Sequence, residues 1–187
     1  REVLKYKDVE KIVLVDIDNE MTKLCSTNEQ IKKLNENSLT NDKVKVINED
    51  AYLFVQENQE KFDVIIIDFP DPNNEALNKL YTNVFYNYIK ANLTPNGVMV
   101  CQSTSPYYAK NSFWCINKTI KTQFANVLPY HLQVPSFGEW GFNLAFNDNN
   151  VRKDLSIETK YLTEENIKSM FNFGKDEMID LDKIEEN

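Results

Sequence analysis

Two carboxylates directly follow a four-residue run of β-branched side chains. Residues 64–67 are Val-Ile-Ile-Ile, and residues 68–72 are Asp-Phe-Pro-Asp-Pro. Such a run predicts a strand buried on both faces, as in parallel sheets, and the two prolines end it. In open α/β sheets, ligands bind just beyond the carboxyl ends of the strands. Asp68 and Asp71 are therefore placed to hold a cation or to accept a proton from an amine.

Each of these side chains also has a plainer interpretation. Asp71 precedes Pro72, which is common in a simple turn. Gln102 ends the next apolar run and could orient a polar substrate, although a surface glutamine would look the same in the sequence.

Two further aspartates end earlier predicted strands. Asp16 closes residues 11–17, and Asp50 follows residues 43–47. A carboxylate at such a strand end can accept hydrogen bonds from both ribose hydroxyls of a nucleoside. A second carboxylate, one βαβ unit later in the chain, can accept a hydrogen bond from the adenine amino group. The alternatives are a solvated strand end for Asp16 and a helix cap for Asp50.

Aromatic residues surround a predicted turn near residue 137. Trp140 and Phe142 share parity on an alternating strand and therefore face the same side, with Phe137 in the turn itself. Such residues more often belong to a core than to a ligand site. His131 lies in an apolar strand, which favours a structural role.

These residues require an α/β fold with a doubly wound, mostly parallel, Rossmann-like sheet, because predicted strands alternate with amphipathic segments. The last two strands lack a helix between them and predict an antiparallel hairpin. The expected strands are residues 11–17, 43–47, 62–68, 97–102, 127–134 and 139–146, and the expected helices are residues 20–34, 51–59, 75–93 and 113–124. We assign residues 1–150 to this domain and residues 151–187 to a polar extension with one short helix at 163–171. Residues 179–187 are expected to fray.

Composition excludes several classes of protein. The formal net charge of −8 argues against nucleic-acid binding, which needs a basic surface. Three cysteines without a C-x-x-C pair suit a reducing compartment. A single histidine argues against a histidine-cluster metal site and a Ser-His-Asp triad, and we expect no metal. No apolar run approaches the roughly 20 residues of a membrane span.

Together these motifs resemble the polyamine aminopropyltransferases, the spermidine synthase family, on the class I S-adenosylmethionine methyltransferase fold. The similarity covers residues 1–146 and is most specific in residues 14–18, 62–72, 102–106 and 135–142. It implies transfer of an aminopropyl group from decarboxylated S-adenosylmethionine to putrescine or a similar amine, without a permanently bound cofactor. The alternatives are a methyltransferase on the same fold and a non-catalytic binding module.

The resemblance also implies a role for each position. Asp16 matches the acid that holds the ribose, and Asp50 matches the one that binds the adenine amino group. Asp68 matches the carboxylate that takes the proton from the attacking amine. The substrate-binding positions are Asp71, Gln102, Phe137 and Trp140, and at Phe137 many members have a tyrosine.

The chain departs from the family at its start. Members place a small β-domain, a glycine-rich loop and the first strand of the sheet before the position of Arg1, whereas the first glycine here is Gly97. We therefore expect this chain alone to be inactive, and the full-length protein to be a cytoplasmic homo-oligomer. The Asp-Phe-Pro-Asp-Pro sequence resembles a bacterial branch whose longer members carry an amino-terminal membrane region, which would anchor the full-length protein.

Overall fold

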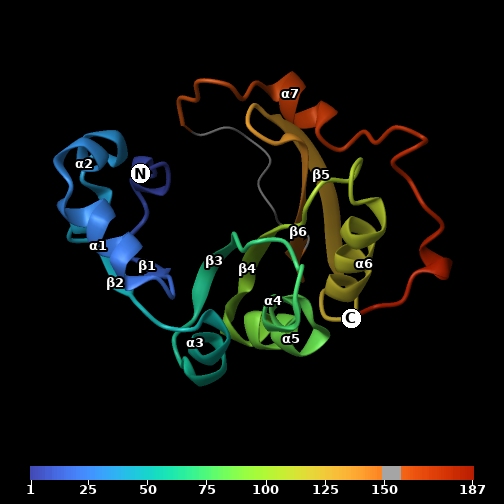
Figure 1. Cartoon of the computed structure of the whole chain (residues 1–187), viewed down its shortest axis with the longest axis horizontal. Coiled ribbons are helices and arrows are strands. Elements are labelled where there is room, and N and C mark those ends of the chain that lie inside the picture. Colours follow the sequence, from blue (N-terminus) through green and yellow to red (C-terminus); the bar gives the residue numbers. More distant parts are fainter. Residues whose placement is uncertain (149–156) are drawn as a thin grey trace. The chain divides into compact units, whose positions relative to one another are not determined.

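The computed structural model describes residues 1–148 and 157–187, which form two compact units (Figure 1). The first unit comprises residues 1–58 with 157–158, and the second comprises residues 59–148 and 159–187. The domain boundary between residues 150 and 151 that the sequence predicts lies outside the described residues and stays a prediction.

The first unit contains a two-stranded parallel sheet. Strands β1 (Ile12–Val15) and β2 (Val44–Ile47) pair in register from Ile12 opposite Val44 to Val15 opposite Ile47. Both strands therefore end level with each other. Its helical elements are η1 (Val3–Lys5), α1 (Asn19–Thr27), α2 (Glu29–Asn35), η2 (Ser38–Thr40) and α3 (Ala51–Glu57).

The single helix predicted for residues 20–34 is two helices in the structure. Asn28 takes an extended backbone conformation, and its side chain accepts hydrogen bonds from the backbone N–H groups of Gln30 and Ile31. Asparagine is among the best residues for starting a helix in this way. Asn28 therefore ends α1 and begins α2 although the apolar periodicity continues through it.

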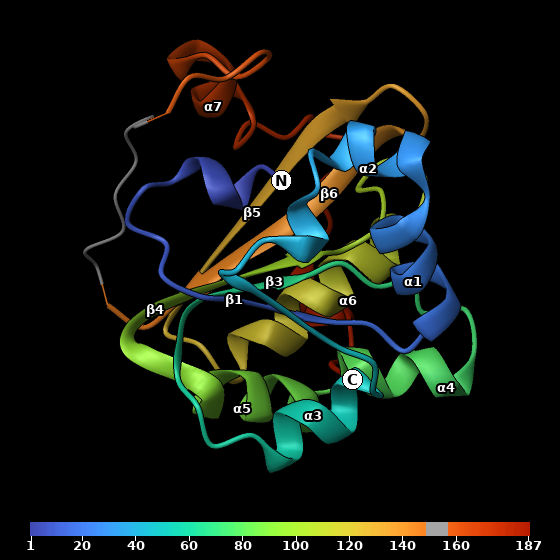
Figure 2. The ribbon, with the colours of Figure 1, turned by 90° about the vertical axis from the view of Figure 1, so that its left-hand side faces the viewer.

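The second unit is built on a four-stranded mixed sheet with the order β3-β4-β6-β5. β3 and β4 are parallel, whereas β6 is antiparallel to both β4 and β5. The strands are β3 (Phe62–Ile67), β4 (Leu93–Gln102), β5 (Asn126–Val134) and β6 (Gly138–Phe146). The long β5–β6 hairpin in Figure 2 confirms the predicted antiparallel end of this α/β fold.

Two helices of this unit pack against the sheet. α5 (Asn83–Asn92) contacts β4, and α6 (Lys110–Lys121) contacts β5 and β6. Their buried faces supply much of the core, which includes Tyr81, Phe85, Tyr86, Ile89, Met99, Phe113 and Ile120. The remaining helical elements are α4 (Glu75–Asn78), η3 (Lys79–Tyr81), α7 (Glu164–Ser169) and η4 (Leu181–Lys183).

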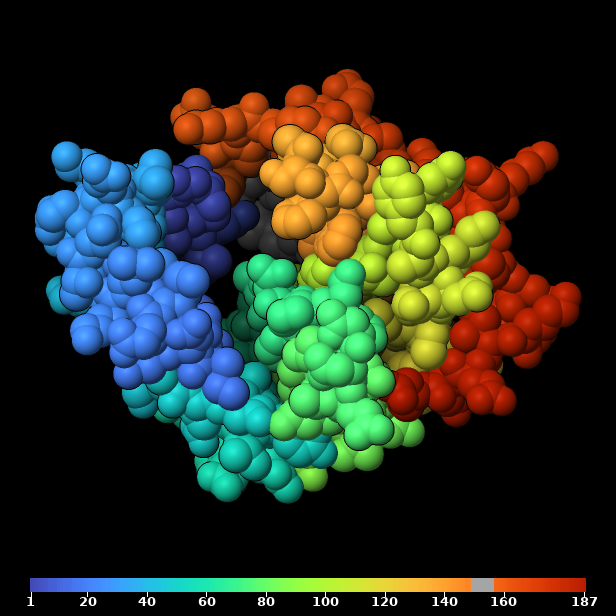
Figure 3. All heavy atoms as spheres, viewed as in Figure 1, coloured from blue at the N-terminus to red at the C-terminus, as the bar shows by residue number. Residues whose placement is uncertain are grey.

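The last residues of the chain lie along α6, where the sequence predicted fraying. The backbone N–H of Asn187 donates to the Thr119 hydroxyl at 2.9 Å, and the Lys118 ammonium donates to the Ile184 carbonyl oxygen. Figure 3 shows the red carboxyl-terminal atoms against the yellow-green atoms of this region. The prediction was wrong because these backbone groups find partners on a helix distant in sequence. Among the described residues, no helix is both long enough and apolar enough to cross a membrane.

Candidate active site

The two acids of the Asp-Phe-Pro-Asp-Pro sequence lie at the carboxyl end of β3. Ile67 pairs with Cys101 on β4, so Asp68 and Gln102 leave neighbouring strands at the same edge of the sheet. The Asp68 side chain is exposed, and no hydrogen bond to it is found in the part of the chain that the structure describes. This carboxylate is therefore open to a ligand.

Asp71, in contrast, is held by two side chains. Gln102 Nε2 donates to Asp71 Oδ1 at 3.1 Å, and Thr104 Oγ1 donates to Asp71 Oδ2 at 3.2 Å. Gln102 is only 7% exposed, so it is a buried positioning group and not a surface residue. Because each carboxylate oxygen has two lone pairs, Asp71 can still accept hydrogen bonds from a ligand.

Tyr81 joins this group, although sequence analysis did not identify it. It is 1% exposed, and its hydroxyl donates to the Pro70 carbonyl oxygen at 3.0 Å and lies 3.3 Å from Gln102 Oε1. Burial raises the pKa of Tyr81 well above its usual value, and Cys101 and the charges of Asp71 and Asp68 add to this. The phenol therefore stays protonated and fixes the segment that carries both acids.

An apolar pocket of about 360 Å³ opens beside Asp68. Tyr130 and Phe142 stack in its wall with ring centroids 5.2 Å apart, and the rings of Phe137 and Trp140 are also 5.2 Å apart. The other lining residues are Ile66, Ile67, Val100, Gln102 and Val134. The aromatic residues near the turn thus line a ligand-sized pocket instead of a closed core.

The segment after Gln102 is fixed by buried polar groups. Asn143 Nδ2 donates to the Ser103 hydroxyl at 3.0 Å, and Asn117 Nδ2 donates to Asn143 Oδ1 at 2.6 Å. The Ser103 hydroxyl in turn donates to the Cys101 carbonyl oxygen. This chain of hydrogen bonds links α6, β6 and β4 directly behind the residues that hold Asp71.

In the first unit, Asp16 and Asp50 follow the two paired strands. Asp16 Oδ1 accepts a hydrogen bond from the Asp18 N–H, and Asp50 caps α3 by accepting from the Tyr52 N–H at 2.9 Å. Asp18 likewise caps α1. The capping alternative for Asp50 is thus observed, while nucleoside binding by Asp16 and Asp50 stays a prediction.

The chain is similar to enzymes of polyamine synthesis. A family model described as "Spermine/spermidine synthase domain" matches residues 1–156. A polyamine aminopropyltransferase of Leptospira interrogans is 46% identical over 177 residues, which are 94% of this chain and 36% of that protein. One of Oceanobacillus iheyensis is 41% identical over 95% of this chain and 35% of its own length. The chain thus spans about a third of the length of these relatives.

Solved structures show the same likeness. Spermidine synthase from Thermotoga maritima superposes with a TM-score of 0.76 at 25% identity, over 93% of this chain and 61% of that one. Human methyltransferase-like protein 13, in complex with SAH, superposes with a TM-score of 0.56 at 17% identity, over 78% of this chain and 64% of that one. The second likeness concerns the fold alone, which is the class I methyltransferase-like fold expected from the sequence.

Proposed function

The chain belongs to the spermine/spermidine synthase family. From this premise we propose that the protein transfers an aminopropyl group from decarboxylated S-adenosylmethionine to putrescine or a similar amine. The observation that carries the proposal is the exposed Asp68 carboxylate beside an apolar pocket, with the braced Asp71 three residues further on.

The proposed reaction is a displacement at carbon. The amine nitrogen attacks the methylene next to the sulfonium, a C–N bond forms, and the C–S bond breaks to release methylthioadenosine. A diamine is doubly protonated near neutral pH, so the attacking nitrogen must first lose a proton, which Asp68 accepts. Holding the nitrogen about 3.3 Å from the carbon supplies much of the remaining acceleration.

The pocket suits an amine with an aliphatic chain. Its apolar and aromatic walls can cover methylene groups, and the faces of Trp140 and Phe142 attract a cation. Asp71, held by Gln102 and Thr104, provides a fixed negative charge for the ammonium that does not react. Phe137 lacks the hydroxyl that a tyrosine would offer, so in this proposal it contributes contact area alone.

We assign the nucleoside contacts to the first unit. Asp16 directly follows β1, and Asp50 lies three residues beyond the end of β2 at the same edge of this parallel pair, which suits a ribose and an adenine amino group respectively. The paired acids suit a cationic amine, which disfavours a methyltransferase activity. No specific observation favours a purely non-catalytic role. The expected homo-oligomer stays a prediction.

Replacing Asp68 by asparagine in the full-length protein tests the proposal. We expect aminopropyl transfer, followed as methylthioadenosine release, to fall about 10²–10⁴-fold, because asparagine cannot accept the proton. Asp63→Asn on the same strand is the matched control and should keep its activity. Unchanged turnover in Asp68→Asn, with an intact thermal transition, would show that another group is the base.

A further inference from the structure

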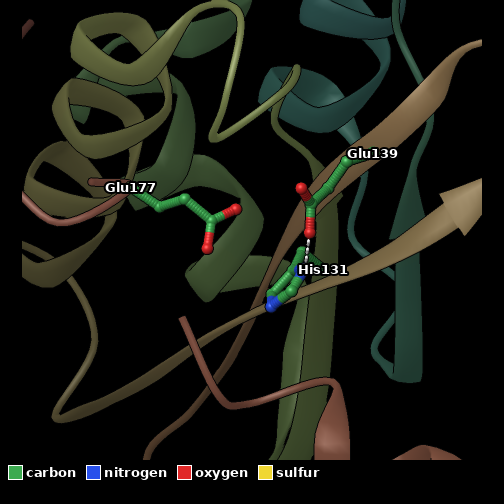
Figure 4. Close-up of side chains that lie close together, drawn as sticks. All are labelled: His131, Glu139 and Glu177. Atoms are coloured by element: carbon green, nitrogen blue, oxygen red, sulfur yellow. Dashed lines mark ion pairs between the residues drawn. The ribbon is translucent and has the colours of Figure 1, made fainter. Parts of the chain in front are cut away.

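Three ionisable side chains converge on the hairpin (Figure 4). His131 comes from β5, Glu139 from β6 and Glu177 from the segment after α7. His131 Nδ1 is paired with Glu139 Oε1, and one ligand atom from each of the three residues lies within 4.8 Å of the others. His131 and Glu139 are diagonal neighbours across the strands, since His131 pairs with Gly141.

The hydrogen bonds of His131 define which nitrogen faces the cluster. Its Nε2 lies 2.8 Å from the Asn172 carbonyl oxygen, which can only accept, so Nε2 carries the hydrogen. In the neutral ring, Nδ1 then carries the lone pair, on the side of Glu139 Oε1. A backbone carbonyl that fixes the imidazole in this way is the usual second partner of a metal-binding histidine.

Glu177 supplies an independent indication of a ligand. The residue is 7% exposed, and its Oε2 accepts the Gly174 N–H. Its buried Oε1 receives no N–H among the described residues, and the neighbour of this carboxylate is the Glu139 carboxyl group. Its backbone is fixed, because Trp114 Nε1 donates to the Glu177 carbonyl oxygen at 2.7 Å. A buried carboxylate oxygen without a partner is costly and needs a donor or a cation.

We propose that His131 Nδ1, Glu139 and Glu177 bind one divalent metal ion, Zn²⁺, with water in the fourth position. Two carboxylates and a neutral imidazole balance the charge of the ion, and imidazole favours zinc over magnesium or calcium. In a tetrahedral site with bonds of about 2.1 Å, ligand atoms lie about 3.4 Å apart, which small side-chain rotations reach from the observed cluster. So compact a cluster fits an ion better than an extended polyamine.

The ion has a structural role. Side chains alternate along each strand, and Tyr130, Trp140 and Phe142 line the pocket, so His131 and Glu139 lie on the opposite face of the hairpin. His131 also donates its backbone N–H to the Met170 carbonyl oxygen at 2.9 Å. The ion therefore fastens residues 170–177 to the hairpin and takes no part in the proposed reaction. A single histidine in the sequence predicts no histidine-cluster site, but two of the three proposed ligands are glutamates, and only the fold brings Glu177 to the hairpin.

Zinc binding to the full-length protein tests this site. After chelator treatment and dialysis, we expect one equivalent of Zn²⁺ per chain by elemental analysis at saturation. Glu177→Gln and Glu139→Gln should each weaken this binding at least tenfold, as ligand losses do. Glu165→Gln, an exposed carboxylate on α7, is the matched control and should bind like the wild type.

Two further measurements keep the proposal testable if Glu177→Gln folds poorly. Zn²⁺ should raise the thermal midpoint of the wild type and of Glu165→Gln by more than that of Glu139→Gln, because a ligand stabilises the folded state in proportion to how tightly it binds. Bound Co²⁺ should give visible absorption that His131→Gln removes. The proposal is overturned if binding is not saturable, if both ligand variants bind like the wild type, or if spermidine reproduces the midpoint shift with the same dependence on the variants.

Discussion

At the scale of single residues, Thr104 combines a strained backbone with a contact to the site. Its φ of 62° lies in the left-handed region, which β-branched residues seldom adopt. The conformation persists because the Thr104 carbonyl oxygen accepts the Gly141 N–H at 2.7 Å while the hydroxyl donates to Asp71. The strain thus places a hydroxyl where it orients a carboxylate.

Removing that hydroxyl should loosen Asp71. We expect Thr104→Val to reduce kcat/KM for the amine by about one to two orders of magnitude, because a hydrogen bond to a charged group contributes about 1.5–3 kcal/mol. Thr104→Ser keeps the hydroxyl and should stay within about twofold of the wild type. Steady-state kinetics of the full-length protein decides between them, and equal losses in both variants would refute an orienting role for the hydroxyl.

The aspartates of the first unit offer a separate test. Asp16→Ala and Asp50→Ser should weaken methylthioadenosine binding by about 1–3 kcal/mol each and leave putrescine binding nearly unchanged, because they remove hydrogen bonds to a sugar and a base. Serine at position 50 can still cap α3, so the free energy of unfolding should change little. Calorimetry with both ligands is the measurement, and equal losses for putrescine would contradict the assignment.

The sequence predicted some site residues and not others for a physical reason. Asp68, Asp71 and Gln102 follow apolar runs, and strand ends in a parallel pair meet at one edge of the sheet. Tyr81 ends a short 3-10 helix, and Thr104 has a left-handed backbone conformation. The spacing of apolar residues in the sequence predicts neither feature, and these features bring the two side chains to the acids. Glu177 joins the hairpin through tertiary contacts alone.

At the scale of elements, Gly141 permits the close approach of α6 to the hairpin. A methyl group there would lie 2.4 Å from Phe113 Cε2 and 2.9 Å from the Thr104 carbonyl oxygen. Gly141→Ala should therefore lower the free energy of unfolding by about 1–3 kcal/mol, as overpacking of a core does. Urea unfolding of the full-length protein measures this.

A second substitution identifies the cause of that loss. Phe113 is fully buried, and Phe113→Leu makes room for the added methyl group. In the double variant Gly141→Ala, Phe113→Leu, the loss of unfolding free energy should be smaller than the sum of the losses in the two single variants, by at least about 0.5 kcal/mol. Strict additivity would mean that the clash with Phe113 is not responsible.

Strands were easier to predict than helices in this chain. The hairpin and the βαβ order appear in the structure, because β-branched runs and alternating parity encode them. Helix breaks were missed where a capping residue interrupts an apolar period. Besides Asn28, Thr82 accepts the Phe85 N–H and begins α5, so the expected helix at 75–93 becomes α4, η3 and α5.

At the scale of the whole molecule, the buried Cys101 thiol and Tyr86 phenol and the partly buried Tyr130 phenol predict a loss of stability at alkaline pH. Burial raises the pKa of Cys101 to about 12, and it raises that of Tyr130 to about 12 and that of Tyr86 well above its usual value. In the unfolded chain the cysteine thiol loses its proton at about pH 8.5, and the two tyrosines lose theirs at about pH 10. The unfolded state then binds fewer protons, so stability is complete below these values and falls as pH rises toward about 12.

Urea unfolding at about pH 7.5, 9 and 10.5 checks this expectation. Each group can lower the free energy of unfolding by up to about 1.4 kcal/mol per pH unit within its window. Tyr130→Phe keeps the stacking ring and should flatten the decline above about pH 10. A stability that is constant up to about pH 10.5 would contradict the prediction.

The two-sided hairpin also restricts how this gene can change its length. Neighbouring residues of β6 face opposite sides of the hairpin. Inserting or deleting one codon between Glu139 and Phe142 would therefore turn side chains that line the pocket toward Glu177, and side chains near Glu177 toward the pocket. A change of two codons would keep both sets in place. We expect natural length variation within the strands to be even-numbered.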